Sequence, residues 1–481
     1  MNYSNLTLHT DKYQINMMYA HWLQGSSNEK AVFEAYFRKL PFGNGFAVFA
    51  GLERIVSYIQ SLRFGDEEIT YLRAQEENYK EEFLEELRHF RFTGNLYAVE
   101  EGTLVFANEP LLCVEGRIFE AQLVETAILN MMNYQTLIAT KAARIKQVAP
   151  DDVLLEFGTR RAQETDAAIW GARASYIAGF HATSNMRAGM LFGIPAKGTH
   201  AHSWVQGHDS EEEAFRLYAE SLPDQVTLLV DTYNTLKSGV PNAIKIAGLL
   251  EQQGKRMNAI RLDSGDLAYL SQMSRKMLDE AGYSYVQIVA SNDLDEGIIA
   301  NLKSQGARID VWGVGTKLIT AADQPSLGGV YKLVAREKNG SYEPVIKISA
   351  NPEKVSTPGF KELYRIVNTE TGKAEADYIT LKGEQHIHDG AKLKLFDPIH
   401  PYIHKYIAHY EAIPLLKTIF SQGELVYGMP SLEQIRSYHQ EQFELFWPQY
   451  LRKLNAEAYR VNLSEAAWEL KRELIQRHQF L

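Results

Sequence analysis

The sequence predicts an α/β protein whose central segment folds as a parallel sheet flanked by helices. From residue 151 onward, short apolar segments recur, and each is followed by a polar turn and then by helix-like sequence. These segments are mostly apolar, which is typical of strands buried on both faces of a parallel sheet. The sequence on either side of these segments does not show this regular repeat. We therefore expect three regions: an N-terminal α+β domain over 1–150, a (β/α) barrel-like domain over 151–336 and a C-terminal region over 337–481.

The composition is that of an ordinary globular protein. Of 481 residues, 45% are apolar and 23% are charged, with a net charge of −10 that argues against binding to nucleic acids or anionic membranes. No apolar run approaches the roughly 20 residues that cross a bilayer. Cys113 is the only cysteine, and residues 1–5 show no secretory pattern. We therefore expect a cytoplasmic protein that binds neither nucleic acid nor membrane.

The first 150 residues alternate between helical and β-type sequence, which predicts a mixed α+β domain. In order, we expect a helix over 7–24 that Thr10 can cap, strands over 31–38 and 46–49, helices within 54–91, short strands within 92–119 and a long helix over 120–147.

In the central region, a strand followed by a polar turn and a helix predicts parallel pairing through right-handed crossovers. The expected strands cover 153–157, 194–196, 226–230, 259–262, 286–290 and 309–314. The expected helices cover 162–180, 210–221, 236–253, 265–281 and 294–305. This repeat could close into a barrel or remain an open, doubly wound sheet.

Chemically reactive side chains gather in the turns after these strands. The turns are Gly158–Arg161, Thr199–Ser203, Asp231–Asn234, Asp263–Asp266, Ser291–Asp293 and Gly313–Thr316. Polar residues at the carboxyl ends of parallel strands are typical of the active-site face of a (β/α) barrel. A buried ionic girdle is the structural alternative.

The sequence changes in character again after residues 325–329. Strands are expected over 330–334, 345–348 and 364–367, and charged helical sequence from about 432 to 481. Because this region lacks comparable polar turns, we interpret it as packing and assembly structure.

The residue types in the turns suit an anionic, phosphorylated substrate. Arg160, Arg161 and Arg261 can pair bidentately with carboxylates or phosphates. Gly313, Gly315 and Thr316 would let backbone N–H groups and a hydroxyl approach a phosphate.

Carboxylates in the same turns can serve a metal. Asp231, Asp263, Asp266 and Asp293 offer oxygen ligands of the kind that Mg²⁺ prefers. Helix N-capping is the simpler role for Asp266 and Asp293.

Two histidines stand close together in the turn Thr199–Ser203. His200 and His202 can change charge near neutral pH, and an imidazole can also act as a nucleophile. A metal-binding pair or two surface imidazoles would be the plainer interpretations.

Several motifs together resemble those of nicotinate phosphoribosyltransferases. They are TDKYQ at 10–14, EFGTRRA at 156–162, GFHATSN at 179–185, GTHAHS at 198–203, RLDSGDL at 261–267 and SLGGVYKLV at 326–334. They occur in the family's order from about residue 7 to the strands that follow the central region. The helical tail is the least recognisable part.

The resemblance implies a type II phosphoribosyltransferase, with an N-terminal α+β sandwich, an irregular (β/α) barrel and a mixed or helical C-terminal region. It implies that nicotinate and 5-phosphoribosyl 1-diphosphate give nicotinate mononucleotide and diphosphate in NAD salvage. ATP would be a co-substrate that phosphorylates His202, and His200 would be a neighbour.

The resemblance also implies a role for each matched residue. Phe157 and Tyr13 would stack on the pyridine ring, with Tyr13 supplied by the second subunit of a homodimer. Thr199 and Arg261 would contact nicotinate, Arg160 and Asp263 would orient the substrates, and Gly313, Gly315 and Thr316 would hold the 5-phosphate.

Two alternatives follow from the same residues. A nicotinamide phosphoribosyltransferase shares the fold, but its members carry an aspartate where this chain has Ser184. A neutral side chain there avoids repelling a carboxylate. A non-catalytic sensor of a phosphorylated metabolite would not need His202 as a nucleophile. An assay of diphosphate release separates the enzyme from the sensor.

Overall fold

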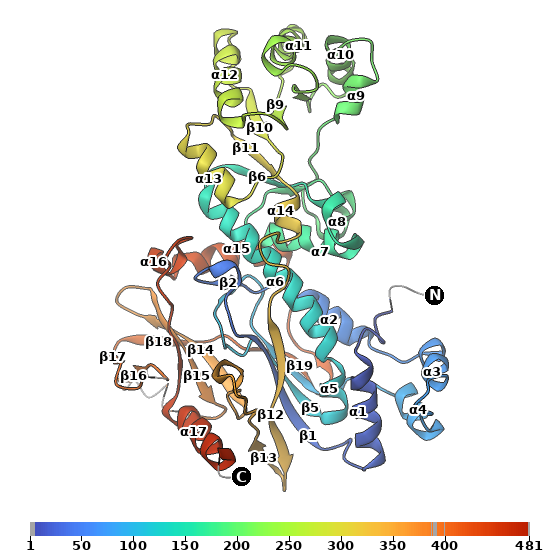
Figure 1. The fold of residues 1–481 in the computed structure, drawn as a ribbon, viewed down its shortest axis with the longest axis vertical. Helices are drawn as coiled ribbons and strands as arrows, with labels where there is room; N and C mark the ends of the chain where they lie inside the picture. Colours follow the sequence, from blue (N-terminus) through green and yellow to red (C-terminus); the bar gives the residue numbers. More distant parts are fainter. Residues whose placement is uncertain (1–4, 386, 388–391, 399, 480–481) are drawn as a thin grey trace. The chain divides into compact units, whose positions relative to one another are not determined.

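The protein, seen in a computed structural model, is described for residues 5–385, 387, 392–398 and 400–479 (Figure 1). Its chain divides into two units. The residues up to 137 form one unit together with those from 326 onward, and residues 138–325 form the other. The two ends of the chain therefore share a unit, which the local sequence pattern does not reveal.

The first unit is built on a seven-stranded sheet in the order β13-β12-β1-β5-β3-β19-β20. Strand β1 (Lys30–Phe37) is buried along nearly its whole length. It pairs antiparallel with β5 (Leu112–Arg117) on one side and with β12 (Gly329–Lys338) on the other. The remaining strands are β3 (Asn95–Ala98), β13 (Ser341–Pro344), β19 (Lys417–Ser421) and β20 (Glu424–Leu425).

A second, four-stranded sheet of this unit has the order β18-β14-β15-β21. Its strands are β14 (Lys361–Asn368), β15 (Ala374–Leu381), β18 (Tyr410–Pro414) and β21 (Val461–Leu463). The Arg365 guanidinium on β14 is fully buried and donates two hydrogen bonds to Asp377 on β15. Two short antiparallel pairs complete the strands: β2 (Ala47–Val48) with β4 (Leu104–Val105), and β16 (Leu393–Phe396) with β17 (His404–Ile407).

The helices of the first unit come from both ends of the chain. They are α1 (Lys12–Leu23), α2 (Leu52–Ser61), α3 (Asp66–Arg73), α4 (Glu81–Arg88), α5 (Ile118–Leu123), α15 (Leu432–Glu444), α16 (Pro448–Leu451) and α17 (Glu465–Gln479). Helix α6 (Glu125–Val148) runs from this unit into the second.

The second unit is a six-stranded parallel sheet in the order β7-β6-β11-β10-β9-β8. The strands are β6 (Val153–Glu156), β7 (Ala182–Thr183), β8 (Thr227–Leu229), β9 (Ala259–Leu262), β10 (Gln287–Ala290) and β11 (Val311–Val314). Their helices are α7 (Glu164–Ile177), α8 (Met186–Phe192), α9 (His202–Gln206), α10 (Glu211–Ser221), α11 (Val240–Gln252), α12 (Leu267–Glu280), α13 (Glu296–Ser304) and α14 (Thr316–Ile319).

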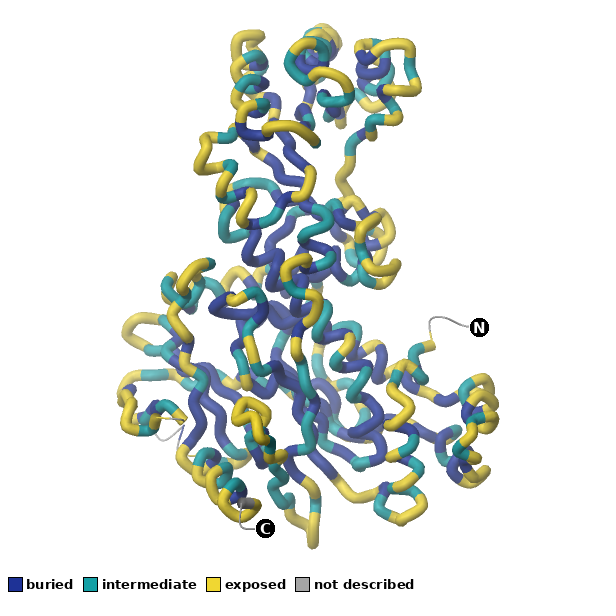
Figure 2. Tube along the Cα trace, in the orientation of Figure 1, coloured by how far each residue is buried: buried dark blue, intermediate teal, exposed yellow. Residues whose placement is uncertain are grey.

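This parallel sheet curls into an open half-barrel. Ala196 extends it by one bridge to Thr183, but within residues 138–325 no strand pairing joins that edge to β8. The strands are buried and the outer helix faces are exposed (Figure 2). The predicted α/β class and irregular barrel are therefore confirmed, and the strand expected over 194–196 reduces to a single bridge.

Two local predictions in the first unit were wrong. Helix α1 begins at Lys12 with Asp11 at its N-cap, and the Thr10 hydroxyl instead donates to the Leu123 carbonyl. The strand expected over 345–348 is absent, and β13 covers Ser341–Pro344 instead. No helix in the described part of the chain is both long and apolar enough to cross a membrane.

Candidate active site

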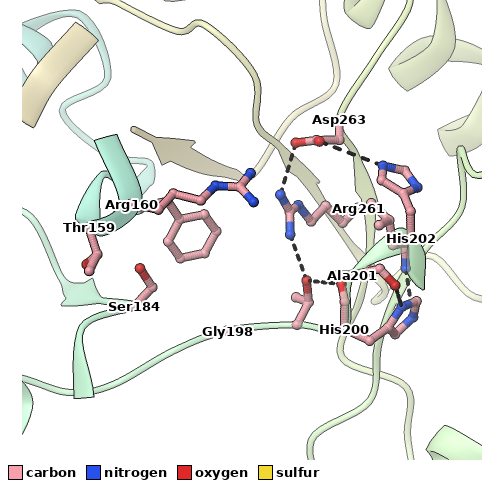
Figure 3. Close-up of a pocket in the computed structure, with 12 residues that line it drawn as sticks. Thr159, Arg160, Ser184, Gly198, His200, Ala201, His202, Arg261 and Asp263 are labelled. Carbon is pink, nitrogen blue, oxygen red and sulfur yellow. Dashed lines mark hydrogen bonds and ion pairs between the residues drawn. The ribbon is translucent and has the colours of Figure 1, made fainter. Parts of the chain in front are cut away.

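A cavity of about 300 Å³ lies at the carboxyl ends of the half-barrel strands, in the second unit (Figure 3). Its lining comes from β8 and β9, from the turns that follow β6, β7 and β9, and from the segment after Ala196. The lining residues are Phe157, Thr159, Arg160, Ser184, Gly198, Thr199, His200, Ala201, His202, Leu229, Arg261 and Asp263. Three of the six polar turns predicted from the sequence, those at 158–161, 199–203 and 263–266, therefore contribute to one cavity.

Arg261 lies in this lining, and three hydrogen bonds donated by its guanidinium group hold it in place. Its side chain is only 16% exposed. Nε donates to the Ser291 hydroxyl at 2.8 Å, Nη1 to the Thr199 hydroxyl at 2.9 Å and Nη2 to Oδ1 of Asp263 at 2.9 Å. Each terminal nitrogen keeps a further N–H. A guanidinium held in this way can present two parallel donors to a carboxylate.

Arg160 lies across the cavity from Arg261. Figure 3 shows its guanidinium pointing toward that of Arg261. Within residues 138–325, Arg160 forms no hydrogen bond or ion pair, and it is exposed. The cavity therefore contains one cation already paired with a carboxylate and one that is unpaired, which favours an anionic ligand.

The Phe157 ring packs over Gly313 of β11. A Cβ atom on Gly313 would lie 2.6 Å from the ring, so only glycine leaves room for Phe157 at this position. The guanidinium carbon of Arg261 lies 5.6 Å from the ring centroid. Gly313 thus has a packing reason to be glycine, which the sequence reasoning attributed to a phosphate alone.

Gly313, Gly315 and Thr316 lie outside the lining of this cavity. Gly315 precedes the short helix α14, and a Cβ there would lie 3.1 Å from the Phe157 carbonyl oxygen. Tyr13 belongs to the first unit, on α1, where its side chain is 48% exposed. The phosphate-binding and shared-site roles of these four residues stay predictions.

Glu156 is a buried carboxylate that the sequence reasoning did not single out. It ends β6 and is 1% exposed. One of its oxygens accepts the Gly158 N–H, and the other accepts the Thr183 hydroxyl at 2.6 Å. Burial raises the pKa of Glu156. The carboxyl group thus joins the turn that contains Phe157 to the turn that contains Ser184. The position of Glu156 directly before a polar turn could have identified it from the sequence.

His202 begins α9 and reaches the cavity with its ring. Its Nδ1 lies 3.0 Å from the Thr232 hydroxyl, and its Nε2 lies 3.9 Å from Oδ2 of Asp263. The side chain is 40% exposed. Thr232 and Asp263 thus hold the ring from two sides while leaving it open to a ligand.

His200 is turned inward, although it stands two residues away. It is 7% exposed, and its Nε2 accepts the Leu229 N–H at 3.2 Å. Its ring packs edge-on against Tyr218 at 4.8 Å. Burial lowers the pKa of His200 to about 4, so the ring is neutral at neutral pH. These contacts give it an anchoring role beside His202.

Asp231 and Asp263 lie next to each other at the ends of β8 and β9. Oδ2 of Asp231 accepts the Asp263 N–H at 2.9 Å and the Ser264 hydroxyl at 2.6 Å. Its Oδ1 is buried without a partner among the described residues. Asp266 instead caps α12 through the Tyr269 N–H, as expected, whereas α13 is capped by Asp295. The cap predicted for Asp293 was therefore wrong.

The arrangement of Asp231 and Asp263 fits a Mg²⁺ ion held partly by substrate. Mg²⁺ commonly takes one or two carboxylates together with phosphate oxygens and water. The unpartnered Oδ1 of Asp231 and the Asp263 carboxylate supply such oxygens. The described residues contain no group of three or more histidine, cysteine or acidic side chains arranged to hold a metal. Substrate phosphates would thus have to complete the coordination.

Known proteins match this chain along nearly its full length. Three profiles, described as the N-terminal domain, the family and the C-terminal domain of nicotinate phosphoribosyltransferase, match residues 8–133, 153–370 and 360–471. A nicotinate phosphoribosyltransferase of Bacillus subtilis is 55% identical over 473 residues, which cover 98% of this chain and 95% of that protein. One from Dictyostelium discoideum is 37% identical over 515 residues, covering 96% and 86%.

The fold agrees with these sequence matches. The crystal structure of human nicotinic acid phosphoribosyltransferase superposes with a TM-score of 0.86 at 31% identity, covering 97% of this chain and 99% of the human one. Sequence profiles, relatives and fold lead to one assignment, and the chain belongs to the nicotinate phosphoribosyltransferase family.

Proposed function

We propose that this chain joins nicotinate to 5-phosphoribosyl 1-diphosphate, giving nicotinate mononucleotide and diphosphate, with ATP hydrolysed through a phosphohistidine at His202. The observation that carries the proposal is the cavity in which Arg261, Phe157 and Arg160 meet beside His202. Membership of the family supports the choice of substrates.

Arg261 and Phe157 form the nicotinate site in this proposal. The free N–H groups of Arg261 receive the carboxylate, and Phe157 stacks on the pyridine ring. Thr199 lies beside them, and its hydroxyl accepts a hydrogen bond from Nη1 of Arg261. Ser184 lies in the same lining without a charge, so it does not repel the carboxylate.

Arg160 and Asp263 orient the second substrate. The pyridine nitrogen attacks the anomeric carbon, the bond from that carbon to the diphosphate oxygen breaks, and diphosphate leaves. The reacting carbon carries positive charge in the transition state, so positioning and charge stabilisation are needed more than a strong base. Arg160 pairs with the leaving diphosphate, while Gly313, Gly315 and Thr316 hold the 5-phosphate.

Asp231 and Asp263 would hold Mg²⁺ through their carboxylate oxygens. When bound, the ion would neutralise charge on the diphosphate. Arg261 keeps Oδ1 of Asp263 in place, so the orientation of this carboxylate does not depend on the metal.

His202 is the phosphate acceptor from ATP. In the tautomer in which Nδ1–H donates to the Thr232 hydroxyl, the Nε2 lone pair faces the cavity. Nε2 attacks the γ-phosphorus, ADP leaves, and water later releases phosphate from the imidazole. Asp263 stabilises the positive charge that the ring gains during the attack.

The active site is shared between two subunits of a homodimer. Tyr13 is an exposed aromatic side chain on α1, in the unit that does not contain the cavity. Its exposure is what a ring supplied to a second subunit requires.

The test is diphosphate release by the purified chain. Release should require both nicotinate and 5-phosphoribosyl 1-diphosphate, and ATP should increase it at low concentrations of the latter. Nicotinamide is the matched control substrate, because it differs by the carboxylate alone. Equal rates with nicotinamide, or no release with nicotinate, would reject the proposal.

A further inference from the structure

A second cavity, of about 500 Å³, lies in the first unit and has no part in the proposed reaction. Helix α17, strand β1 and the segment before β14 contribute to its walls. Most of the lining is apolar, with Val355, Ile379, Leu463 and Ile475 among it. A cavity of this volume, apolar with a few polar groups, is typical of sites for small organic ligands.

The acidic residues of this lining are already paired. Oε2 of Glu34 lies 2.9 Å from the Lys361 ammonium, and both side chains are buried. Glu353 pairs with Lys39 at 3.2 Å. Both acidic side chains of the cavity thus already have a lysine as their ion-pair partner.

Two cations of the lining remain without a carboxylate. Lys471 donates to the Thr357 hydroxyl at 3.2 Å, and Arg472 lies over the Trp468 ring at 4.5 Å. Neither forms an ion pair with a residue that the structure describes. Burial, followed by the proximity of Lys361, lowers the pKa of Lys471. The lining nevertheless holds three cationic side chains, Lys361, Lys471 and Arg472, against two acidic ones.

A further polar atom in the lining requires a hydrogen-bond donor. Oε1 of Glu34 is buried and has no partner among the described residues. The Glu34 side chain is only 3% exposed. A buried acceptor without a donor costs free energy, and a ligand that brings a donor removes this cost.

We propose that this cavity binds a small organic anion that carries an aromatic ring and a hydrogen-bond donor, of the kind found in nucleotides and in aminated aromatic carboxylates. Lys471 and Arg472 bind the anionic group, the apolar wall with Tyr36 and Trp468 holds the ring, and Glu34 accepts from the donor. This site is separate from the proposed nicotinate site and does not depend on it.

Calorimetric titration of the full chain tests the proposal with two probes, AMP and 4-aminobenzoate. Both have a ring and a donor, but one carries a phosphate and the other a carboxylate. At least one should bind saturably, and Lys471→Met should weaken that binding roughly tenfold or more by removing the charge while keeping the stem. Tighter binding of AMP assigns a phosphate, and tighter binding of 4-aminobenzoate assigns a carboxylate.

Arg477→Ala is the matched control, because Arg477 is exposed on the same helix and pairs with Glu473. It should leave binding unchanged. Arg472→Gln provides a second loss of charge, at an exposed position. The site is rejected if neither probe binds, or if both cation variants bind like the wild type. It is also rejected if inorganic phosphate binds as tightly as AMP. Loss of the same binding in Arg261→Lys would reject it as well.

Discussion

Nε2 of His202 lies 3.9 Å from Oδ2 of Asp263, while Nδ1 of the same ring lies 3.0 Å from the Thr232 hydroxyl. His200, two residues earlier, instead uses its ring to accept the Leu229 N–H. The two histidines of one short turn therefore have different environments, and this difference makes their roles separable by experiment.

ATP should label the protein with an acid-labile, base-stable phosphate on His202. His202→Ala should abolish the label and ATP hydrolysis, yet retain slower synthesis with a raised KM for 5-phosphoribosyl 1-diphosphate, because displacement of diphosphate does not use the imidazole. A phosphorylated ring can tighten the site only by the difference in affinity between its two states. His200→Gln, which keeps an acceptor for Leu229, should retain the label. Loss of label with His200→Gln and its retention in His202→Ala would assign the nucleophile to His200.

Arg261→Lys should lower kcat/KM for nicotinate by about one to two decades. A lysine supplies one point charge instead of a planar fork, and a lost charged hydrogen bond is worth roughly 1.5–3 kcal/mol. Steady-state kinetics with nicotinate measures the effect. Lys245→Arg, at an exposed ion pair on α11, is the matched control and should leave kcat/KM unchanged. If Arg261→Lys also leaves it unchanged, Arg261 does not bind the carboxylate.

Ser184→Asp should shift preference from nicotinate toward nicotinamide. A second carboxylate in the cavity would repel the substrate's own, whereas an amide could donate to it. Competition between the two substrates measures the ratio of nicotinate use to nicotinamide use. Ser184→Asn is the control, because asparagine has the size of aspartate without its charge. A ratio that stays constant in Ser184→Asp would show that Ser184 does not select the substrate.

Tyr13 and Phe157 should act in one site that two subunits share. Tyr13→Ala and Phe157→Ala should each impair nicotinate use as homodimers. If the site is shared, a mixed dimer of the two variants contains one site with both substitutions and one with neither, so mixing should restore activity. If both residues come from one chain, every site in the mixture keeps one substitution, and no activity returns.

His200 should make stability depend on acid pH. Its pKa falls from 6.5 to about 4 in the folded protein because of burial, so its contribution is complete above pH 6.5 and is lost as pH falls toward 4. The shift corresponds to about 3 kcal/mol. Urea midpoints between pH 7 and 4.5 should fall less steeply in His200→Gln than in the wild type. Parallel slopes in the two proteins would contradict a neutral, buried His200.

The sequence alone was enough to find the repeating strands and their polar turns. Strand β9 covers Ala259–Leu262, as predicted, because a short, mostly apolar segment followed by a polar turn marks the limits of a parallel strand locally. Three of the six polar turns contribute to one cavity because parallel strands place their carboxyl ends at one edge. The strand-and-turn pattern is therefore sufficient to group Arg261, Asp263, His202 and Phe157 at one site.

Only the tertiary structure decided what those residues contact. The sequence does not show that Gly313 makes room for Phe157, that Leu229 donates to His200, or that Glu156 joins two turns. It also does not show that β12 pairs with β1, since nearly three hundred residues separate the two strands in the chain. Secondary structure follows from the local pattern of apolar and polar residues, whereas burial, pKa and hydrogen-bond partners depend on which distant segments pack together.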